Sequence, residues 1–219
     1  MNSPLIQLLV LAGIAVFLIL RLKNVLGTRE GFEKPPVSDQ TPAPRSGPAF
    51  EVIEGGPDLD ITDHVPADST SGKALAEMKR LEPSFGVSDF LQGARGAYEM
   101  IVMGYERGDL KEIQPFLAED VYESFVDGVA AREDQGLTID ANFIGVREME
   151  LVDARLDDTT KEAEMTIRFV GELTSEVRNR EGEVVEGSSK EIKRQKDTWV
   201  FARVMGSDDP NWLLVSTDG

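Results

Sequence analysis

The sequence predicts an α+β domain, in which helices come first along the chain and an antiparallel sheet follows. Between about residues 70 and 135, apolar residues recur at helical spacing. From about residue 151 onward they alternate with polar residues, which is typical of half-buried strands. Alternating strands and helices, which would indicate an α/β protein, are not seen in this pattern. Before the domain, we expect an N-terminal transmembrane helix and a disordered linker.

The N-terminus carries an apolar run from Leu5 to Leu22. Its length is close to the roughly 20 residues that a helix needs to cross a bilayer. No basic residue precedes it and no small-residue cleavage site follows, which favours an uncleaved anchor over the alternative of a cleaved signal peptide. Arg21, Lys23 and Arg29 follow the run, so the positive-inside rule predicts an outer N-terminus and a cytoplasmic C-terminal side. We therefore expect residues 1–26 to form a single-pass transmembrane anchor.

Residues 27–69 are rich in proline, glycine, serine, threonine and aspartate. These residues offer little apolar surface to bury, and its burial would not offset the chain entropy lost on ordering. The composition therefore predicts a flexible, Pro-rich linker. Phe50, Val52 and Ile53 form an apolar island within it, either as a docking motif or as an incidental loop cluster. The domain is then predicted to occupy residues 70–219.

The first helix of the domain is predicted over residues 71–81, and it is locally basic because of Lys73, Lys79 and Arg80. A basic amphipathic helix on the membrane side of a domain can lie on a lipid surface. The alternative is a solvated helix that packs a few residues on the core.

The longest helix is predicted over residues 88–107, with Ser88 or Asp89 as its N-cap. It has one broad apolar stripe, and a second stripe that contains Gly93, Gly96 and Gly104. Each glycine costs a helix about 1 kcal/mol relative to alanine, so we expect a close backbone or ligand to compensate. The later elements are a helix at 119–135, strands at 151–156, 163–177, 190–205 and 212–217, and a hairpin turn at 179–182.

The residue types of the chain exclude several classes of function. There is no cysteine and only one histidine, His64, which lies in the predicted linker, so no nucleophile–histidine pair is available in the domain. The acidic residues are scattered at exposed strand positions or paired in turns, and we predict neither a metal site nor a cofactor. A net charge of −17 argues against nucleic-acid binding.

One catalytic alternative stays open, an acid/base enzyme of the isomerase or dehydratase type. In it, Asp197 would act together with Tyr98 or Tyr105. A buried carboxylate with a raised pKa can remove a proton from a carbon acid. This alternative requires the side chain of Asp197 to face the interior.

Four stretches, in order, resemble the C-terminal domain of the Tim44 family of mitochondrial import-motor subunits. They are FLQGARGAYEMIVMGYERGDL, FLAEDVYESFVDGVAAREDQG, DTWVFAR and SDDPNWLLVSTDG. The resemblance covers about Phe85 to Gly219. Bacterial members similarly carry one membrane span before the domain, so the resemblance implies a protein of the bacterial inner membrane.

The resemblance also implies a nuclear-transport-factor-two-like fold, in which a curved antiparallel sheet wraps over helices around a conical apolar pocket. The residues expected to line a lipid or peptide pocket are Phe90, Tyr98, Ile101, Val102, Tyr105, Phe125 and Trp199. In the mitochondrial relative, helices before the domain contact cardiolipin, and Lys73, Lys79 and Arg80 lie in the corresponding place.

The function that follows is a membrane-tethered, non-catalytic binding or scaffold module on the cytoplasmic face. Its expected partners are membrane lipids, including anionic lipids similar to cardiolipin, and a translocase, chaperone or other membrane-protein partner. The long charged N-terminal region of the mitochondrial relative is missing here, so binding to the import motor is not carried over. The sequence does not specify an oligomeric state.

Overall fold

The structure is a computed structural model, and it describes residues 56–218. The helices are α2 Leu59–Thr62, α3 Thr70–Leu81, α4 Val87–Arg107, α5 Leu110–Ile113, the 3-10 helix η1 Gln114–Phe116, and α6 Glu119–Asp134. The strands are β1 Thr138–Leu156, β2 Glu162–Arg178, β3 Val184–Val204 and β4 Leu213–Asp218. The order of helices and then strands confirms the α+β prediction. The predicted anchor and the linker up to residue 55 lie outside the described residues.

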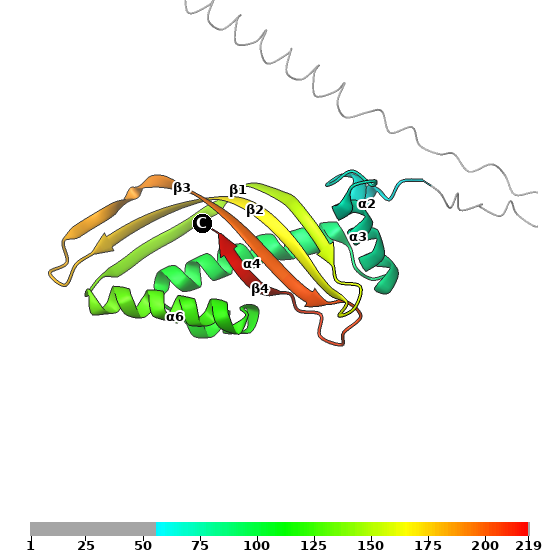
Figure 1. The fold of residues 1–219 in the computed structure, drawn as a ribbon. Helices are drawn as coiled ribbons and strands as arrows, with labels where there is room; N and C mark the ends of the chain where they lie inside the picture. Colours follow the sequence, from blue (N-terminus) through cyan, green and yellow to red (C-terminus); the bar gives the residue numbers. More distant parts are fainter. Residues whose placement is uncertain (1–55, 219) are drawn as a thin grey trace, which may run out of the picture. The chain divides into compact units, whose positions relative to one another are not determined.

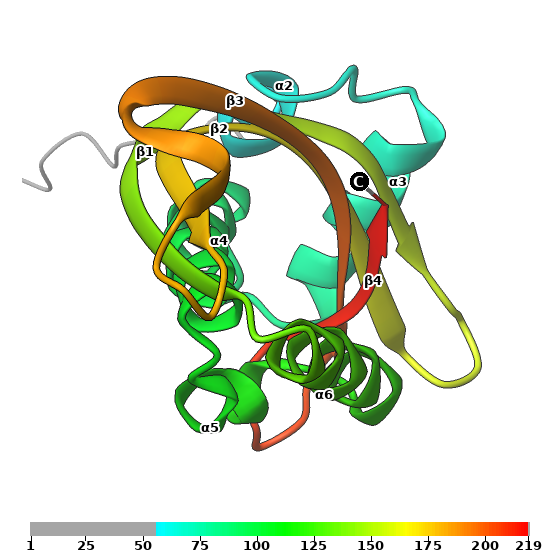
Figure 2. The same cartoon turned by 90° about the vertical axis from the view of Figure 1, so that its left-hand side faces the viewer.

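The strands form one antiparallel sheet in the order β1-β2-β3-β4 (Figure 1). The sheet arches over α4 and α6, and its curl is seen along the strands in Figure 2. Register shifts interrupt the pairing of β1 with β2 at three places. Because a bulge bends and twists its strand, these shifts help the sheet to curve around one face. Within residues 56–218, no helix is both long and apolar enough to cross a membrane.

Strand β1 begins at Thr138, well before the predicted start at residue 151. From Thr138 to Gly145 exposed and half-buried residues alternate strictly, with Ile139, Ala141 and Phe143 on the half-buried side, so the sequence pattern of this part was present but was missed. The alternation is lost only over residues 145–149, near the register shifts at Phe143/Gly145 and Val146/Glu148. Strand β3 likewise begins at Val184 rather than at residue 190, in a stretch that is almost wholly exposed.

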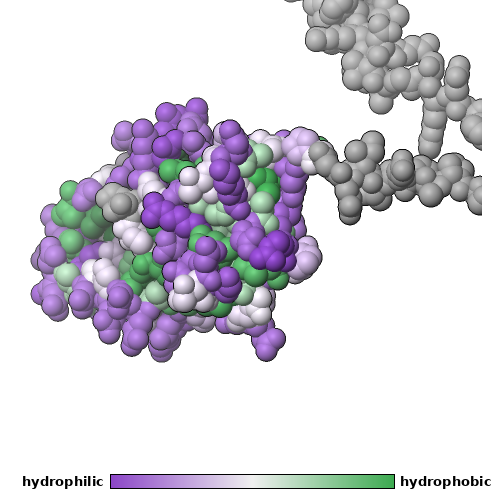
Figure 3. All heavy atoms as spheres, turned by 45° about the vertical axis from the view of Figure 1, so that its right-hand side comes forward, coloured by the Kyte–Doolittle hydropathy of each residue, from purple (hydrophilic) through white to green (hydrophobic). Residues whose placement is uncertain are grey.

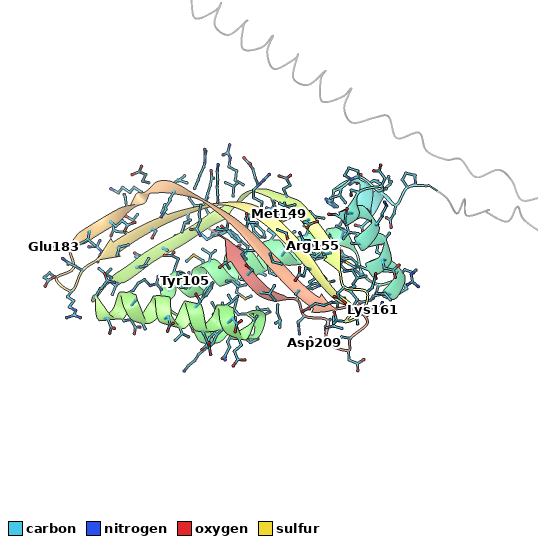
Figure 4. All side chains as sticks on the ribbon, viewed as in Figure 1. Tyr105, Met149, Arg155, Lys161, Glu183 and Asp209 are labelled. Carbon is cyan, nitrogen blue, oxygen red and sulfur yellow. The ribbon has the colours of Figure 1, made fainter. Side chains whose placement is uncertain are left out.

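The core lies between the inner face of the sheet and the apolar stripe of α4. Figure 4 shows side chains filling this space, and Figure 3 shows hydrophilic side chains around smaller apolar areas on one outer face.

The three glycines of α4 differ in how closely other atoms approach them. A Cβ added at Gly104 would lie 2.5 Å from Cγ2 of Ile113. A Cβ added at Gly93 or Gly96 would have no atom of the described residues within 4 Å, apart from its own helix backbone and chain neighbours. The expected close approach is therefore present at one glycine of three.

The folded domain begins before residue 70, which corrects the predicted end of the linker. Ile61 of α2 is only 4 % exposed and belongs to the core cluster. Asp60 accepts hydrogen bonds from the backbone N–H groups of Val87 at 2.8 Å and Ser88 at 2.9 Å. It therefore caps α4 from a distance, in place of the predicted caps at Ser88 or Asp89. Ile61, the partly buried Val65 and the capping carboxylate of Asp60 hold this segment against the rest of the domain.

Replacing Asp60 by alanine is expected to lower the free energy of unfolding by about 0.5–2 kcal/mol, the range measured for helix caps. The reason is that two N–H groups of α4 lose their acceptor and Lys79 loses a partner at 3.0 Å. Urea titration of the domain at neutral pH measures the change. Asp68→Ala is the control, because Asp68 is exposed and no change is expected.

The effect of Asp60 should also depend on pH. Partial burial alone would raise the pKa of Asp60, but hydrogen bonds from Ser88, Val87 and Lys79 outweigh it and hold the pKa well below its usual range. A depressed pKa in the folded state stabilises the domain above the ordinary aspartate value of about 3.9. The difference between wild type and Asp60→Ala should therefore shrink as the pH falls below that value, and a constant difference would contradict this assignment.

Candidate functional site

A cavity of about 290 Å³ lies between the C-terminal half of α4, helix α6 and the inner face of β3. Its lining residues are Ile101, Val102, Tyr105, Glu106, Phe125, Gln195, Asp197, Trp199 and Thr217. Figure 4 labels Tyr105 in the space between the sheet and α6. We call this space the aromatic cavity, because Tyr105, Phe125 and Trp199 form much of its wall.

The structure brings most of the predicted pocket residues together in this cavity. Those that line it are Ile101, Val102, Tyr105, Phe125 and Trp199. Phe90 lies elsewhere, in a second cavity of about 350 Å³ that Phe201 and Trp212 also line. Tyr98 is fully buried in the core. Binding of a lipid or peptide by these residues stays a prediction.

Tyr98 fills the centre of the concave interior. Its ring stacks on Phe169, with centroids 4.4 Å apart, and lies 4.7 Å from the ring of Trp199. Its hydroxyl donates a hydrogen bond to Oδ2 of Asp197. Burial first, and then the neighbouring carboxylate, raise the pKa of Tyr98 above its ordinary value. Tyr98 is therefore neutral over the physiological range and acts as a hydrogen-bond donor in the core.

Asp197 faces the interior, as the acid/base alternative requires, and is 7 % exposed. Its two oxygens accept from different donors, Oδ2 from Tyr98 and Oδ1 from the amide of Gln195 at 3.1 Å. Tyr105 is not its partner. The Tyr105 ring instead lies 4.7 Å from Phe125, with the guanidinium of Arg132 at 4.6 Å from the Tyr105 centroid.

Glu106 of α4 lines the cavity, and it was not among the predicted pocket residues. It is half-buried in the structure, and no hydrogen bond or ion pair to another described residue holds its carboxylate. Burial raises the pKa of Glu106, and the positive charges of Arg132 and Lys193 only partly oppose this. Gln195 was also missed. The only indication in the sequence is that it lies two and four residues before Asp197 and Trp199, so the three side chains share one face of the strand.

Residues 71–219 match the sequence profile of the Tim44-like domain family. The chain belongs to the Tim44-like domain family. The match spans α3 through β4, and it confirms the resemblance found in the sequence. No curated protein sequence matches the chain. Among solved structures, it is similar to the intermembrane space region of the chloroplast protein ARC6, with 12 % identity and a TM-score of 0.34, over 50 % of this chain and 75 % of that one.

The Tim44-like domain uses part of its predicted membrane-facing basic segment internally. Lys79 pairs with Asp58 at 2.6 Å and with Asp60 at 3.0 Å, next to the start of α4. Arg80 pairs with Glu77 one turn earlier on α3. Lys73 is exposed. Lipid contact by this basic segment, Lys73, Lys79 and Arg80, stays a prediction. It depends chiefly on Lys73, because Lys79 and Arg80 are paired with carboxylates of the domain.

Gly171→Ala is expected to destabilise the Tim44-like domain by about 1–3 kcal/mol through overpacking. A Cβ on this β2 residue would lie 2.7 Å from the hydroxyl and 2.9 Å from Cε1 of Tyr98, which has no room to move between Phe169 and Trp199. Thermal unfolding checks the prediction. Gly145→Ala on β1 is the control, since no atom lies within 4 Å of its added Cβ. Equal effects of the two substitutions would contradict it.

Proposed function

We propose that this protein is a membrane-tethered, non-catalytic binding module that holds a partner at the cytoplasmic face of the bacterial inner membrane. Residues 1–26 would be the anchor, residues 27–55 the linker, and the curved sheet over α4 and α6 a nuclear-transport-factor-two-like cone. The observation that chiefly supports the proposal is the aromatic cavity, in which aromatic and aliphatic side chains meet four polar ones, Glu106, Gln195, Asp197 and Thr217.

The proposed partners follow from the family. A Tim44-like domain fits a role beside a translocase, a chaperone or another factor of membrane-protein biogenesis. In this role the cavity would take an acyl chain or an apolar peptide segment. The exposed Lys73 would add contact with anionic lipids similar to cardiolipin.

The test of a partner is photo-crosslinking of the full chain in native membranes. A photoreactive phenylalanine analogue at Phe125 lies in the cavity wall, whereas the same group at Glu183 lies at the tip of the β2–β3 hairpin (Figure 4). We expect a discrete adduct from the first position that the second does not give. Recovery of the uncrosslinked protein alone from both positions would count heavily against a binding module.

The lipid contact is tested by liposome flotation of a fragment that starts at residue 56, so that α2 is kept. We expect the fragment to float with anionic liposomes and not with neutral ones, and Lys73→Glu to reduce flotation. If no binding occurs even to anionic liposomes, the predicted anchor would be the only membrane contact.

The acid/base enzyme stays the second candidate, because Asp197 is buried beside Tyr98. The test is incubation of the purified protein with a small-molecule cell extract, followed by mass spectrometry over time. Turnover by wild type that Asp197→Asn lacks would support the enzyme. Unchanged crosslinking by Asp197→Asn, with no turnover by either protein, would support the binding module.

A further inference from the structure

The aromatic cavity has an uneven distribution of charge. Two of its lining residues, Glu106 and Asp197, carry carboxylates, and none of its lining residues is basic. Asp197 is already engaged by Tyr98 and Gln195, but Glu106 has neither a hydrogen bond nor an ion pair to any residue from 56 to 218. A half-buried carboxylate without a partner is costly for the fold, and a cation placed beside it would offset that cost.

The apolar wall of the cavity also suits a cation. The rings of Tyr105, Phe125 and Trp199 all line it. The face of an aromatic ring attracts an ammonium or guanidinium group within about 6 Å of its centroid. Arg132 shows this contact outside the cavity lining, with its guanidinium 4.6 Å from the Tyr105 centroid. Aromatic cages bind quaternary ammonium ligands in this way, and a carboxylate beside the rings adds a charge partner.

An acyl chain with an anionic headgroup suits the cavity less well. A headgroup that entered would meet Glu106 and Asp197, and like charges at short distance repel. The net charge of −17 over the whole chain has the same sign, so it also favours the approach of cations over anions.

We infer that the aromatic cavity binds an ammonium group carried on an aliphatic stem, with Glu106 as its principal charge partner. The inference rests on the proposed binding function, but it gives the ligand in the same cavity a cationic head in place of the wholly apolar acyl chain or peptide segment. The stem packs between Phe125 and Trp199, while the ammonium group lies near Glu106. The same chemistry has two sources, a free alkylamine or the lysine side chain of a partner peptide.

The binding of such a ligand should be linked to pH. The charged and titratable groups around Glu106 are Arg132 from α6, Lys193, Glu186 and Asp197 from β3, and Tyr105 from α4. Since burial raises the pKa of Glu106, this carboxylate takes up a proton at a higher pH than an exposed glutamate does, and an incoming cation must displace that proton. Affinity should therefore fall as the pH is lowered, and this dependence should be absent in Glu106→Gln.

The test uses the full chain in detergent micelles, with three probes of equal length: butylammonium, butan-1-ol and butyrate. Calorimetry and the fluorescence of Trp199, in a Trp212→Phe background, report binding. We expect saturable binding of butylammonium, at least about tenfold weaker binding of butan-1-ol, and none of butyrate. Glu106→Gln should weaken butylammonium about tenfold and leave butan-1-ol unchanged. Glu99→Gln removes the same charge from an exposed position of α4, and it should change the affinity for neither butylammonium nor butan-1-ol.

Two peptides distinguish the sources of the ammonium group. One carries a single lysine among alanines, and the other carries the same lysine acetylated on its side chain. Tighter binding of the first peptide than of butylammonium assigns the cavity to a lysine side chain. Binding of butylammonium without binding of the peptide assigns it to a free amine.

The inference is overturned if butylammonium shows no saturable binding up to about 10 mM, where even a millimolar site would be filled. Equal affinity for butyrate, or an unchanged affinity in Glu106→Gln, overturns it as well. A crosslinked adduct at Phe125 together with any of these results would leave the binding function standing with a ligand of other chemistry. The absence of that adduct as well would reject both.

Discussion

Replacing Tyr98 by alanine is expected to lower the free energy of unfolding by about 3–5 kcal/mol, the range found when large buried aromatic side chains are removed. Tyr98 is fully buried, stacks on Phe169 and touches Trp199. The substitution would empty the centre of the core and leave Asp197 without one of its two donors. Denaturant titration of the domain from residue 56 onward measures the change.

Tyr98→Phe separates the hydroxyl from the ring. It should cost about 1–3 kcal/mol, because a buried carboxylate oxygen then lacks a hydrogen bond. The matched control is Tyr122→Phe on α6, where the half-buried tyrosine makes no side-chain hydrogen bond within the described residues. Wild-type stability of Tyr98→Phe would show that the bond to Asp197 contributes nothing to the fold.

The second large effect is expected from Glu82→Ala, at about 3 kcal/mol, because it leaves a buried guanidinium without its counter-ion. The Arg203 side chain is 7 % exposed, and its Nη2 donates to Oε2 of Glu82 at 2.6 Å. The same oxygen accepts from the backbone N–H of Gly206 at 3.1 Å. For a domain of this size, the loss corresponds to a fall in Tm of roughly 6–12 °C.

Two further variants make this prediction sharper. Glu77→Ala removes a solvent-exposed ion pair with Arg80, and we expect no measurable change in Tm. Adding Arg203→Met to Glu82→Ala should recover part of the lost stability, since no buried charge is then left without a partner. If the double variant is less stable than Glu82→Ala alone, the packing of Arg203 on Trp212, at 5.3 Å, matters more than its charge.

The pair should also depend on pH. The hydrogen bond from Arg203 is the main cause that lowers the pKa of Glu82, against a smaller opposing effect of burial. A lowered pKa in the folded state means that the stabilisation is present above the ordinary glutamate value of about 4.3 and is lost as the pH falls below it. Thermal scans at a series of acidic pH values should show wild type approaching Glu82→Ala.

The fold could be predicted where local periodicity and burial agree. Helices α3, α4 and α6 and strand β2 follow from their apolar spacing, because each buries one face on a single core. The sequence did not predict α2, the cap of α4 by Asp60 or the first half of β1. The cap joins residues far apart in the sequence, so it leaves no local pattern. The first residues of β1 do alternate, and the bulges after Phe143 separate that alternation from the part of the strand that was predicted.

The candidate site was predicted only in its apolar part. The aliphatic and aromatic residues of its wall were predicted from the apolar stripe of α4 and from the alternation of apolar and polar residues along β3. Glu106 was missed because a polar residue on a helix is expected to face water, whereas here β3 and α6 enclose that face. Its surroundings depend on how distant elements pack, and helical periodicity contains no information about that packing.

The cap of α4 by Asp60 determines how a pulling force would enter the domain. Tension applied from the N-terminal side reaches α2 first, and the bonds from Asp60 to Val87, Ser88 and Lys79 pass it to the start of α4. Part of the load also reaches the sheet, because α3 follows α2 in the chain and its Ser71 donates a hydrogen bond to Asp153 of β1 at 2.6 Å. Under force, α2 should therefore detach first, and the load should then divide between the start of α4 and the edge strand β1.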